Sequence, residues 1–141
     1  MSLGEGRLMS DSPEAVVRRF LAAWAHPDAS ELGGFFDDDA VWVDGPQGVR
    51  HGAAAIVTEL TSQLTIGGGG SPEIDTLLAD DGIVMVEWRG ELRVNGQIIP
   101  TRVMAVFELD AAGRITQMRE CYDLQSLLNQ IAAASGSSPA T

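Results

Sequence analysis

A single glutamate interrupts an otherwise apolar row near the end of the chain. Successive side chains of a β-strand point to opposite faces, and the even positions of residues 115–124 place Glu120 between Met118 and Tyr122. A carboxylate on an apolar face costs on the order of several kcal/mol unless it is paired, protonated or near water. Proteins keep such groups where a site needs a shifted pKa. Glu120 is therefore our first candidate for acid–base catalysis, with a solvent-exposed strand end or a structural ion pair as the alternative.

A second carboxylate ends an earlier apolar stretch. Trp42 and Asp44 share one face of the strand predicted at 40–44, so Asp44 points inward if Trp42 does. Alternatively, Asp44 only starts the GPQG turn, a common role for aspartate. Two carboxylates in an apolar cavity tend to have pKa values that are pushed apart, which lets one act as acid and the other as base. We expect Glu120 and Asp44 to be that pair. We expect the walls of the substrate pocket to be Trp42, Trp88 and Tyr122.

The elements that position these residues follow from periodicity and turn signals. Helical spacing of apolar residues and alternating runs bounded by Gly, Asn and Asp predict four helices and five strands. The predicted helices cover 13–24, 28–36, 53–65 and 124–134, and the predicted strands cover 40–44, 72–79, 83–94, 97–109 and 115–123. Three helices followed by a meander of strands indicate an α+β fold, with the helices packed on one face of a curved sheet.

The strand predicted at 83–94 has two contrasting faces. Its even positions are apolar and include Trp88, and its odd positions form a charged row of Glu87, Arg89, Glu91 and Arg93. A two-residue type I′ turn at Asn95-Gly96 pairs Trp88 with Val103 and sends the charged row outward, as a solvated or dimer-forming surface. A three-residue turn with a bulge would reverse the two faces. Arg89 and Glu91 would then point inward, as further catalytic candidates.

Composition argues against several classes of partner. The chain has 20 acidic and 9 basic residues and a net charge of −11, whereas nucleic acid and anionic membranes recruit clustered Lys and Arg. Cys121 is the only cysteine, which excludes an intramolecular disulfide and multi-cysteine zinc sites. His26 and His51 are isolated, so neither indicates a metal. We expect no cofactor. We also expect a cytoplasmic location, because no apolar run approaches the about 20 residues of a membrane span.

The polar, small-residue ends of the chain suggest its domain organisation. We expect a disordered tail at 1–11, one domain at 12–134 and a second disordered tail at 135–141.

Two segments resemble a known group of proteins. The runs FFDDDAVWVDGP and GRITQMRECYDL are similar to those of the nuclear transport factor 2-like superfamily, and within it to SnoaL-like proteins and limonene-1,2-epoxide hydrolase. The resemblance covers about 13–132. It implies a cone-shaped, curved mixed sheet with three N-terminal helices on its concave face and a short C-terminal helix. It also implies a homodimer and a small apolar ligand in an internal pocket.

The resemblance also suggests chemistry. These epoxide hydrolases use an Asp–Arg–Asp arrangement, and Glu120 falls at their water-activating acid, while Trp42 and Asp44 fall at a tyrosine and an asparagine that hold the water. Arg89-Gly90-Glu91 has the composition of their Arg-x-Asp motif, yet an ungapped match places Trp88 and Gly90 there. Hydrolysis of an epoxide is the leading expectation.

Two alternatives remain open. Asp44 also falls where related ketosteroid isomerases carry a proton-shuttling aspartate, although Phe20 and Ala105 occupy their oxyanion positions. A ketosteroid-isomerase-like or polyketide-cyclase-like enzyme is therefore one alternative, and a non-catalytic ligand-binding module is the other.

Overall fold

The computed structural model describes residues 11–68 and 70–136. The predicted tails at 1–11 and 135–141 therefore lie mostly outside the described residues. The helices are α2 (Pro13–Ala22), the 3₁₀ turn η1 (Ala23–Ala25), α3 (Ala29–Gly33), the 3₁₀ turn η2 (Gly45–Gln47), α4 (Ala53–Ile66) and α5 (Leu124–Ala134). The strands are β1 (Phe36–Val43), β2 (Val49–His51), β3 (Glu73–Asp80), β4 (Ile83–Val94), β5 (Gln97–Leu109) and β6 (Ile115–Cys121).

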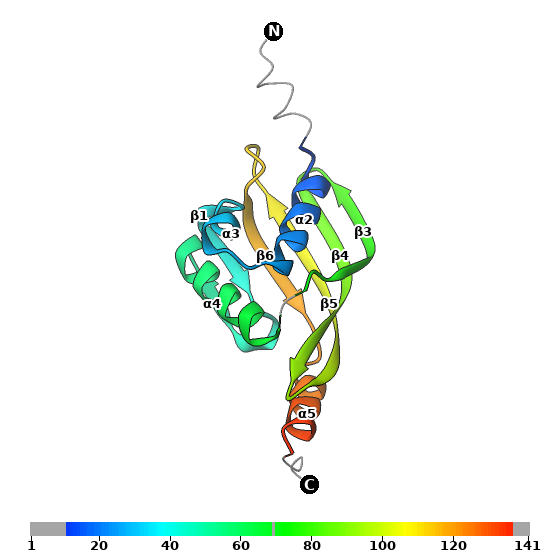
Figure 1. Ribbon diagram of the computed structural model, residues 1–141. Coiled ribbons are helices and arrows are strands. Elements are labelled where there is room, and N and C mark those ends of the chain that lie inside the picture. The colour runs from blue at the N-terminus through cyan, green and yellow to red at the C-terminus, as the bar shows by residue number, and fades with distance from the viewer. Residues whose placement is uncertain (1–10, 69, 137–141) are drawn as a thin grey trace.

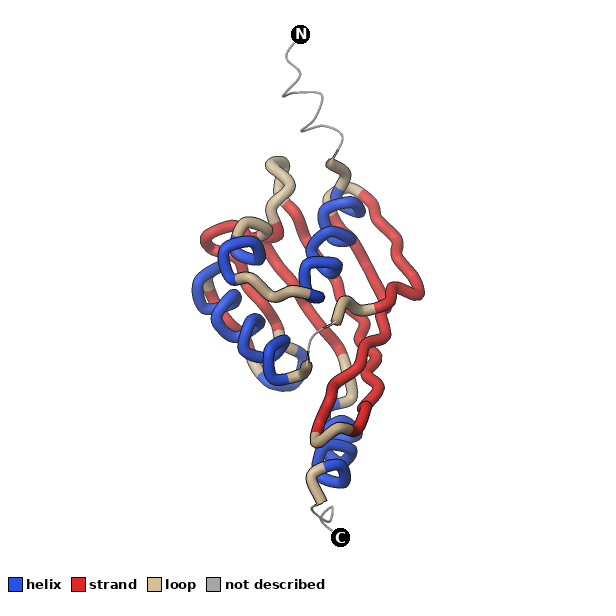
Figure 2. The backbone as a smooth tube through the Cα atoms, in the orientation of Figure 1, coloured by secondary structure: helices blue, strands red, loops and turns tan. Residues whose placement is uncertain are grey.

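One mixed, curved sheet organises the molecule. Its strand order is β2-β1-β6-β5-β4-β3, and β1 runs parallel to β6 while the other neighbours are antiparallel. Helices α2, α3 and α4 lie on one face of the sheet, and α5 lies beyond the far end of the β4–β5 hairpin (Figures 1 and 2). The predicted α+β fold, with three helices on one face of the sheet and a short C-terminal helix, is confirmed.

The β4–β5 hairpin adopts the two-residue turn. Asn95 and Gly96 have φ angles of 50° and 78°, which a type I′ turn requires at both central positions. The register pairs Trp88 with Val103, as the alternation predicted. Trp88 is buried, whereas Arg89 points outward and forms a bidentate pair with Asp75.

The core lies between the helices and the concave face of the sheet. Phe20 of α2 is at its centre and makes edge-to-face contacts with Trp24, Phe35, Phe36 and Phe107. Such aromatic pairs add about 0.5–1.5 kcal/mol each beyond the burial of their area. Together, these rings fix α2 and η1 against β1 and β5, the strands on either side of β6.

Two predicted boundaries around the first strand were wrong, and so was the end of the last strand. The second helix ends at Gly33 instead of 36, because consecutive glycines favour termination. The next residues join the sheet, where Ile115 N donates to Phe35 O at 2.8 Å, so β1 begins at Phe36 instead of 40. The three-residue strand β2 was not predicted. The last strand, β6, stops at Cys121 instead of 123. Asp123 instead caps α5, because its side chain accepts a 2.9 Å hydrogen bond from Ser126 N.

Candidate active site

The centre of the site is a hydrogen bond between neighbouring parallel strands. The indole Nε1 of Trp42 donates to Oε1 of Glu120 at 2.7 Å. Glu120 is half-buried as a residue, and its carboxyl group lies in the interior. Burial is the main cause that raises its pKa to about 8; the Trp42 hydrogen bond opposes this rise, and the nearby charge of Asp44 adds to it. Glu120 therefore carries a proton at neutral pH.

Asp44 is the most deeply buried charged residue of the described chain, with 1% of its surface exposed. It follows β1 directly and points to the same side as Trp42. Tyr122 Oη donates to Oδ1 at 3.0 Å, and Gln63 Nε2 donates to Oδ2 at 2.9 Å. These donors compensate the carboxylate for its loss of water, since a buried charge needs partners.

A cation completes the surroundings of Asp44. Arg50 of β2 stands opposite Trp42 in the antiparallel β1–β2 ladder. Its Nη2 lies 3.8 Å from Oδ2 of Asp44 and 3.7 Å from Oε2 of Glu59. Its guanidinium carbon lies 5.9 Å from the centre of the Trp42 ring, within the range of a cation–π contact. One arginine thus contacts both the aspartate and the indole that holds Glu120.

Tyr122 ties the chain beyond β6 to the turn beyond β1. Its hydroxyl accepts a bond from Gln47 Nε2 at 2.6 Å while it donates to Asp44. Burial raises the pKa of Tyr122 well above its usual value, so the hydroxyl keeps its proton and acts as a donor. A Cβ at Gly45 would lie 2.6 Å from this ring, and Gly45 has a φ of 49°. Glycine is therefore required for the turn to pass so close to the tyrosine.

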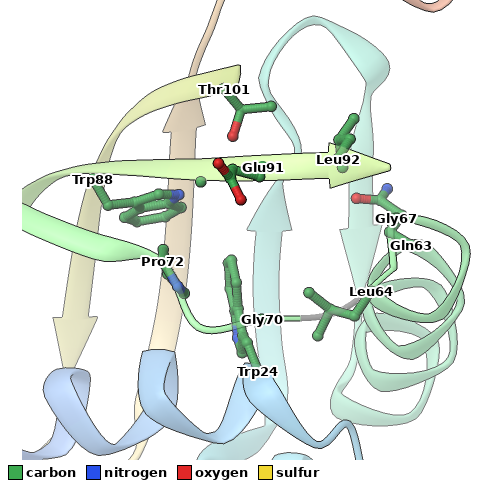
Figure 3. Close-up of a pocket in the computed structure, with 11 residues that line it drawn as sticks. Trp24, Gln63, Leu64, Gly67, Gly70, Pro72, Trp88, Glu91, Leu92 and Thr101 are labelled. Carbon is green, nitrogen blue, oxygen red and sulfur yellow. The ribbon is translucent and has the colours of Figure 1, made fainter. Parts of the chain in front are cut away.

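A cavity of about 90 Å³ adjoins this cluster, between the helices and strand β4. Its lining includes Trp24, Gln63, Leu64, Trp88 and Leu92 (Figure 3). Trp24 and Trp88 meet edge to face, with ring centres 5.4 Å apart. Neither carboxylate lines the cavity. Gln63 connects the two parts of the site, because it lines the cavity and donates to Asp44.

The remaining predicted site residues are divided between the two faces of the sheet. Trp88 lines the cavity, whereas Trp42 and Tyr122 belong to the hydrogen-bonded cluster. Arg89 is on the outer face, where its bond to Asp75 holds the pKa of that carboxyl below its usual range. Glu91 is exposed and is one of the residues that line the cavity (Figure 3). The Arg-x-Asp arrangement of the epoxide hydrolases is therefore not assembled around Glu120.

Three residues around Asp44 were missed from the sequence: Arg50, Glu59 and Gln63. Arg50 is on the short strand that no periodicity revealed. Glu59 and Gln63 lie four residues apart on α4, beside the predicted apolar stripe, and Gln63 Nε2 donates to both Glu59 and Asp44. The sequence signal that could have identified Glu59 and Gln63 is their i, i+4 spacing next to Leu60, which places them on one side of the helix.

Within 11–68 and 70–136, no group of three or more His, Cys, Asp and Glu residues could hold a metal ion. His51 and Cys121 are both exposed in this part of the chain. The described residues form no helix that is long and apolar enough to span a membrane.

Comparison with known proteins identifies the class of domain. The model of the SnoaL-like domain matches residues 17–118. The chain therefore belongs to the SnoaL-like family of the nuclear transport factor 2-like superfamily, as the sequence resemblance implied. Among curated proteins none matches the sequence.

Solved structures share the fold at low identity. A protein assigned as a SnoaL-like polyketide cyclase, from Shewanella denitrificans OS-217, is 16% identical with a TM-score of 0.74, covering 86% of this chain and 97% of its own. The epoxide hydrolase/cyclase-like enzyme SalBIII of salinomycin pyran-ring formation is 21% identical with a TM-score of 0.73, covering 82% and 94%. A protein with a ketosteroid isomerase-like fold, from Catenulispora acidiphila DSM 44928, is 20% identical with a TM-score of 0.72, covering 86% and 92%.

Proposed function

We propose that this protein is an enzyme that acts on a small, largely apolar molecule by general acid–base catalysis, with Glu120 and Asp44 as the acid pair. One observation carries the proposal: the two carboxyl groups lie in one cluster but in unequal surroundings. Glu120 receives a single hydrogen bond, from Trp42. Asp44 has two donors and a nearby guanidinium. Unequal surroundings of this kind let one carboxyl group hold a proton while the other stays ionised.

The raised pKa of Glu120 reverses the roles expected from the sequence. The resemblance suggested that Glu120 activates water as a base. A carboxyl group whose pKa is about 8 is mostly protonated at pH 7, so it is better suited to donate a proton. Asp44, surrounded by donors and Arg50, is the group better suited to accept one. We therefore assign Glu120 as the general acid and Asp44 as the general base.

Opening of an epoxide is the reaction that we favour. Glu120 gives its proton to the epoxide oxygen as the carbon–oxygen bond breaks. Asp44 takes a proton from water, whose oxygen forms the new bond to carbon, and the product is a diol. A proton then returns from Asp44 to Glu120 through solvent. If a hydroxyl of the substrate replaces the water, the same steps give a cyclic ether.

The cavity defines the kind of molecule that would be bound. Its walls are mainly the rings of Trp24 and Trp88 and the side chains of Leu64 and Leu92. We place the apolar part of the substrate there and its reactive end beside Gln63, which lines the cavity and donates to Asp44. Pockets for complete small ligands are usually about 300–1,000 Å³, so binding would displace lining side chains.

Two other functions are each favoured by one observation. A ketosteroid-isomerase-like or polyketide-cyclase-like proton shuttle is favoured by the burial of Asp44 at the end of the first strand. Non-catalytic ligand binding is favoured by the separation between the cavity and the carboxyl groups, neither of which lines it.

We also propose that the protein forms a homodimer through the outer face of its sheet. Met85 and Met104 are 55% and 58% exposed there, on adjacent strands, and Leu78 is 69% exposed on β3. The charges expected to form this interface are instead paired within the chain, as in Arg89–Asp75 and Arg102–Glu87. Exposed apolar side chains that cluster on one face are typical of a self-association surface.

Kinetic measurements on two variants test the catalytic proposal. Cyclohexene oxide and styrene oxide serve as epoxide substrates and an unsaturated ketone as the isomerase substrate. Glu120→Gln and Asp44→Asn should each lower kcat by about 10²–10⁴, while Glu31→Gln, an exposed control, should not. Turnover of the ketone alone would indicate the isomerase, and saturable binding without turnover would indicate a binding module. Full epoxide activity in Glu120→Gln would contradict the acid role of Glu120.

A further inference from the structure

Arg50 occupies a position in this site that the acid pair alone does not explain. The β1–β2 ladder places it directly opposite Trp42, and 29% of its side chain is exposed. Its Nη2 is shared between Asp44 at 3.8 Å and Glu59 at 3.7 Å. Its Nε is buried without a hydrogen-bond partner among the described residues. A partly buried guanidinium is unfavourable unless nearby groups compensate for its loss of water.

Two paths lead from Arg50 to the two carboxyl groups. The first is the direct ion pair with Asp44. The second passes through Trp42, whose ring lies under the guanidinium and whose Nε1 donates to Glu120. We propose that Arg50 is a positioning residue that holds the Asp44 carboxyl group through its ion pair and keeps the Trp42 indole in place for Glu120. This inference rests on the proposed function for the roles of the two acids.

The groups that face Arg50 determine what its removal should do. They are Asp44 after β1, Glu59 of α4 and, through Trp42, Glu120 of β6. The Tyr122 hydroxyl contacts the other carboxyl oxygen of Asp44, Oδ1. His51, its neighbour in the chain, is exposed. Because three of these groups are acids, the loss of the guanidinium charge should make protons bind more tightly to the coupled pair.

The indole of Trp42 provides a direct readout that needs no substrate. Its Nε1 proton is bonded to Glu120, so its NMR chemical shift follows the protonation of that carboxyl group. The chain has 3 tryptophans, so the indole region of a ¹H–¹⁵N spectrum is simple. Trp24 Nε1 has no partner among the described residues and serves as an internal control.

The experiment follows the indole signals of the full chain from pH 5 to pH 10 in four proteins. Relative to the native protein, Arg50→Met should raise the Trp42 midpoint by about one pH unit, while Arg50→Lys should restore most of the native value. Glu59→Gln should lower the midpoint, because it removes an anion that competes for Arg50. The Trp24 signal should not titrate with these variants.

An unchanged Trp42 midpoint in Arg50→Met overturns the inference. If that variant does not fold, the absence of a downward shift in Glu59→Gln overturns it instead. The result is independent of turnover, so failure of the epoxide proposal in the kinetic test and failure of the Arg50 role in this titration are separate outcomes.

Discussion

Trp42 and Glu120 are joined across two parallel strands by a hydrogen bond of 2.7 Å from indole to carboxyl. An indole can donate but cannot accept, so this bond is available whether the carboxyl group is ionised or protonated. It favours the ionised form, but burial has the larger effect and raises the pKa to about 8. The pair therefore gives the site an acid that is protonated at neutral pH.

The stability of the protein should fall as the pH rises from 5 to 9. The pKa of Glu120 is about 8 in the folded chain, against an ordinary value of 4.5. The folded state therefore binds this proton more tightly than the unfolded state. The resulting stabilisation is complete below about pH 4.5, decreases as pH rises, and is lost above about pH 8, with a total on the order of a few kcal/mol. Urea unfolding at several pH values measures the slope.

Glu120→Gln supplies the matched variant for that slope. Glutamine does not titrate, so the free energy of unfolding of this variant should depend much less on pH across this window. The exposed control Glu31→Gln should keep the native slope. Equal slopes in the native protein and Glu120→Gln would show that Glu120 has an ordinary pKa.

Removal of the indole donor should shift the titration of Glu120 further upward. Trp42→Phe keeps an aromatic ring but deletes the Nε1 proton, which is the interaction that lowers the pKa. We expect the midpoint of the Glu120 carboxyl carbon to rise by about one pH unit. Trp24→Phe is the control, since its Nε1 has no partner within the described residues. A rise of the same size in both variants would contradict a specific role for Trp42.

A small side chain that replaces a glycine of the cavity should weaken binding. Gly67 lines the cavity with an ordinary backbone conformation, and a Cβ there would lie 2.8 Å from Cδ2 of Leu92 and 3.1 Å from the carbonyl oxygen of Gln63. Gly67→Ala should therefore push Leu92 into the cavity and raise the dissociation constant of cyclohexene oxide about tenfold, equivalent to ~1.4 kcal/mol.

The binding measurement follows the Trp88 indole signal in the Glu120→Gln background, where turnover should be negligible. Ser62→Ala, an exposed change on the same helix, should leave the dissociation constant unchanged. Native affinity in Gly67→Ala would mean that the ligand binds elsewhere.

The proposed dimer makes a prediction about mass in solution. Charges at Met85 and Met104 would place two carboxylates per subunit in the interface, where desolvation is unfavourable. Met85→Glu/Met104→Glu should therefore be monomeric by light scattering under conditions in which the native protein is a dimer. Ile66→Glu, at a position that is 79% exposed at the end of α4, should remain dimeric. Dimers in both variants would exclude this face.

The parts of the fold that alternation and turn chemistry control were predictable. Asn95-Gly96 determined the hairpin register, and that register predicted which way Trp88 and Arg89 point. Period two predicted that Trp42 and Asp44 share one face of the strand, and the structure buries both. Local signals of this kind need no knowledge of distant segments.

The partners of Asp44 were not predictable in the same way. Arg50 reaches Asp44 from a three-residue strand that is too short to show periodicity. Gln63 reaches it from α4, and only the packing of that helix on β1 brings the amide to the carboxylate. The same tertiary contacts explain why the sequence suggested Glu120 as a base: its burial, which determines its pKa, depends on elements far away in the chain.

A pH titration of the Glu120 side-chain carboxyl carbon by ¹³C NMR in the native protein is the decisive test of the acid role of Glu120. If Glu120 is the acid, the midpoint lies near 8 and the carboxyl group is still protonated at pH 7. A midpoint near its ordinary value of 4.5 would contradict that role, because Glu120 would then be ionised at neutral pH and unable to act as the acid.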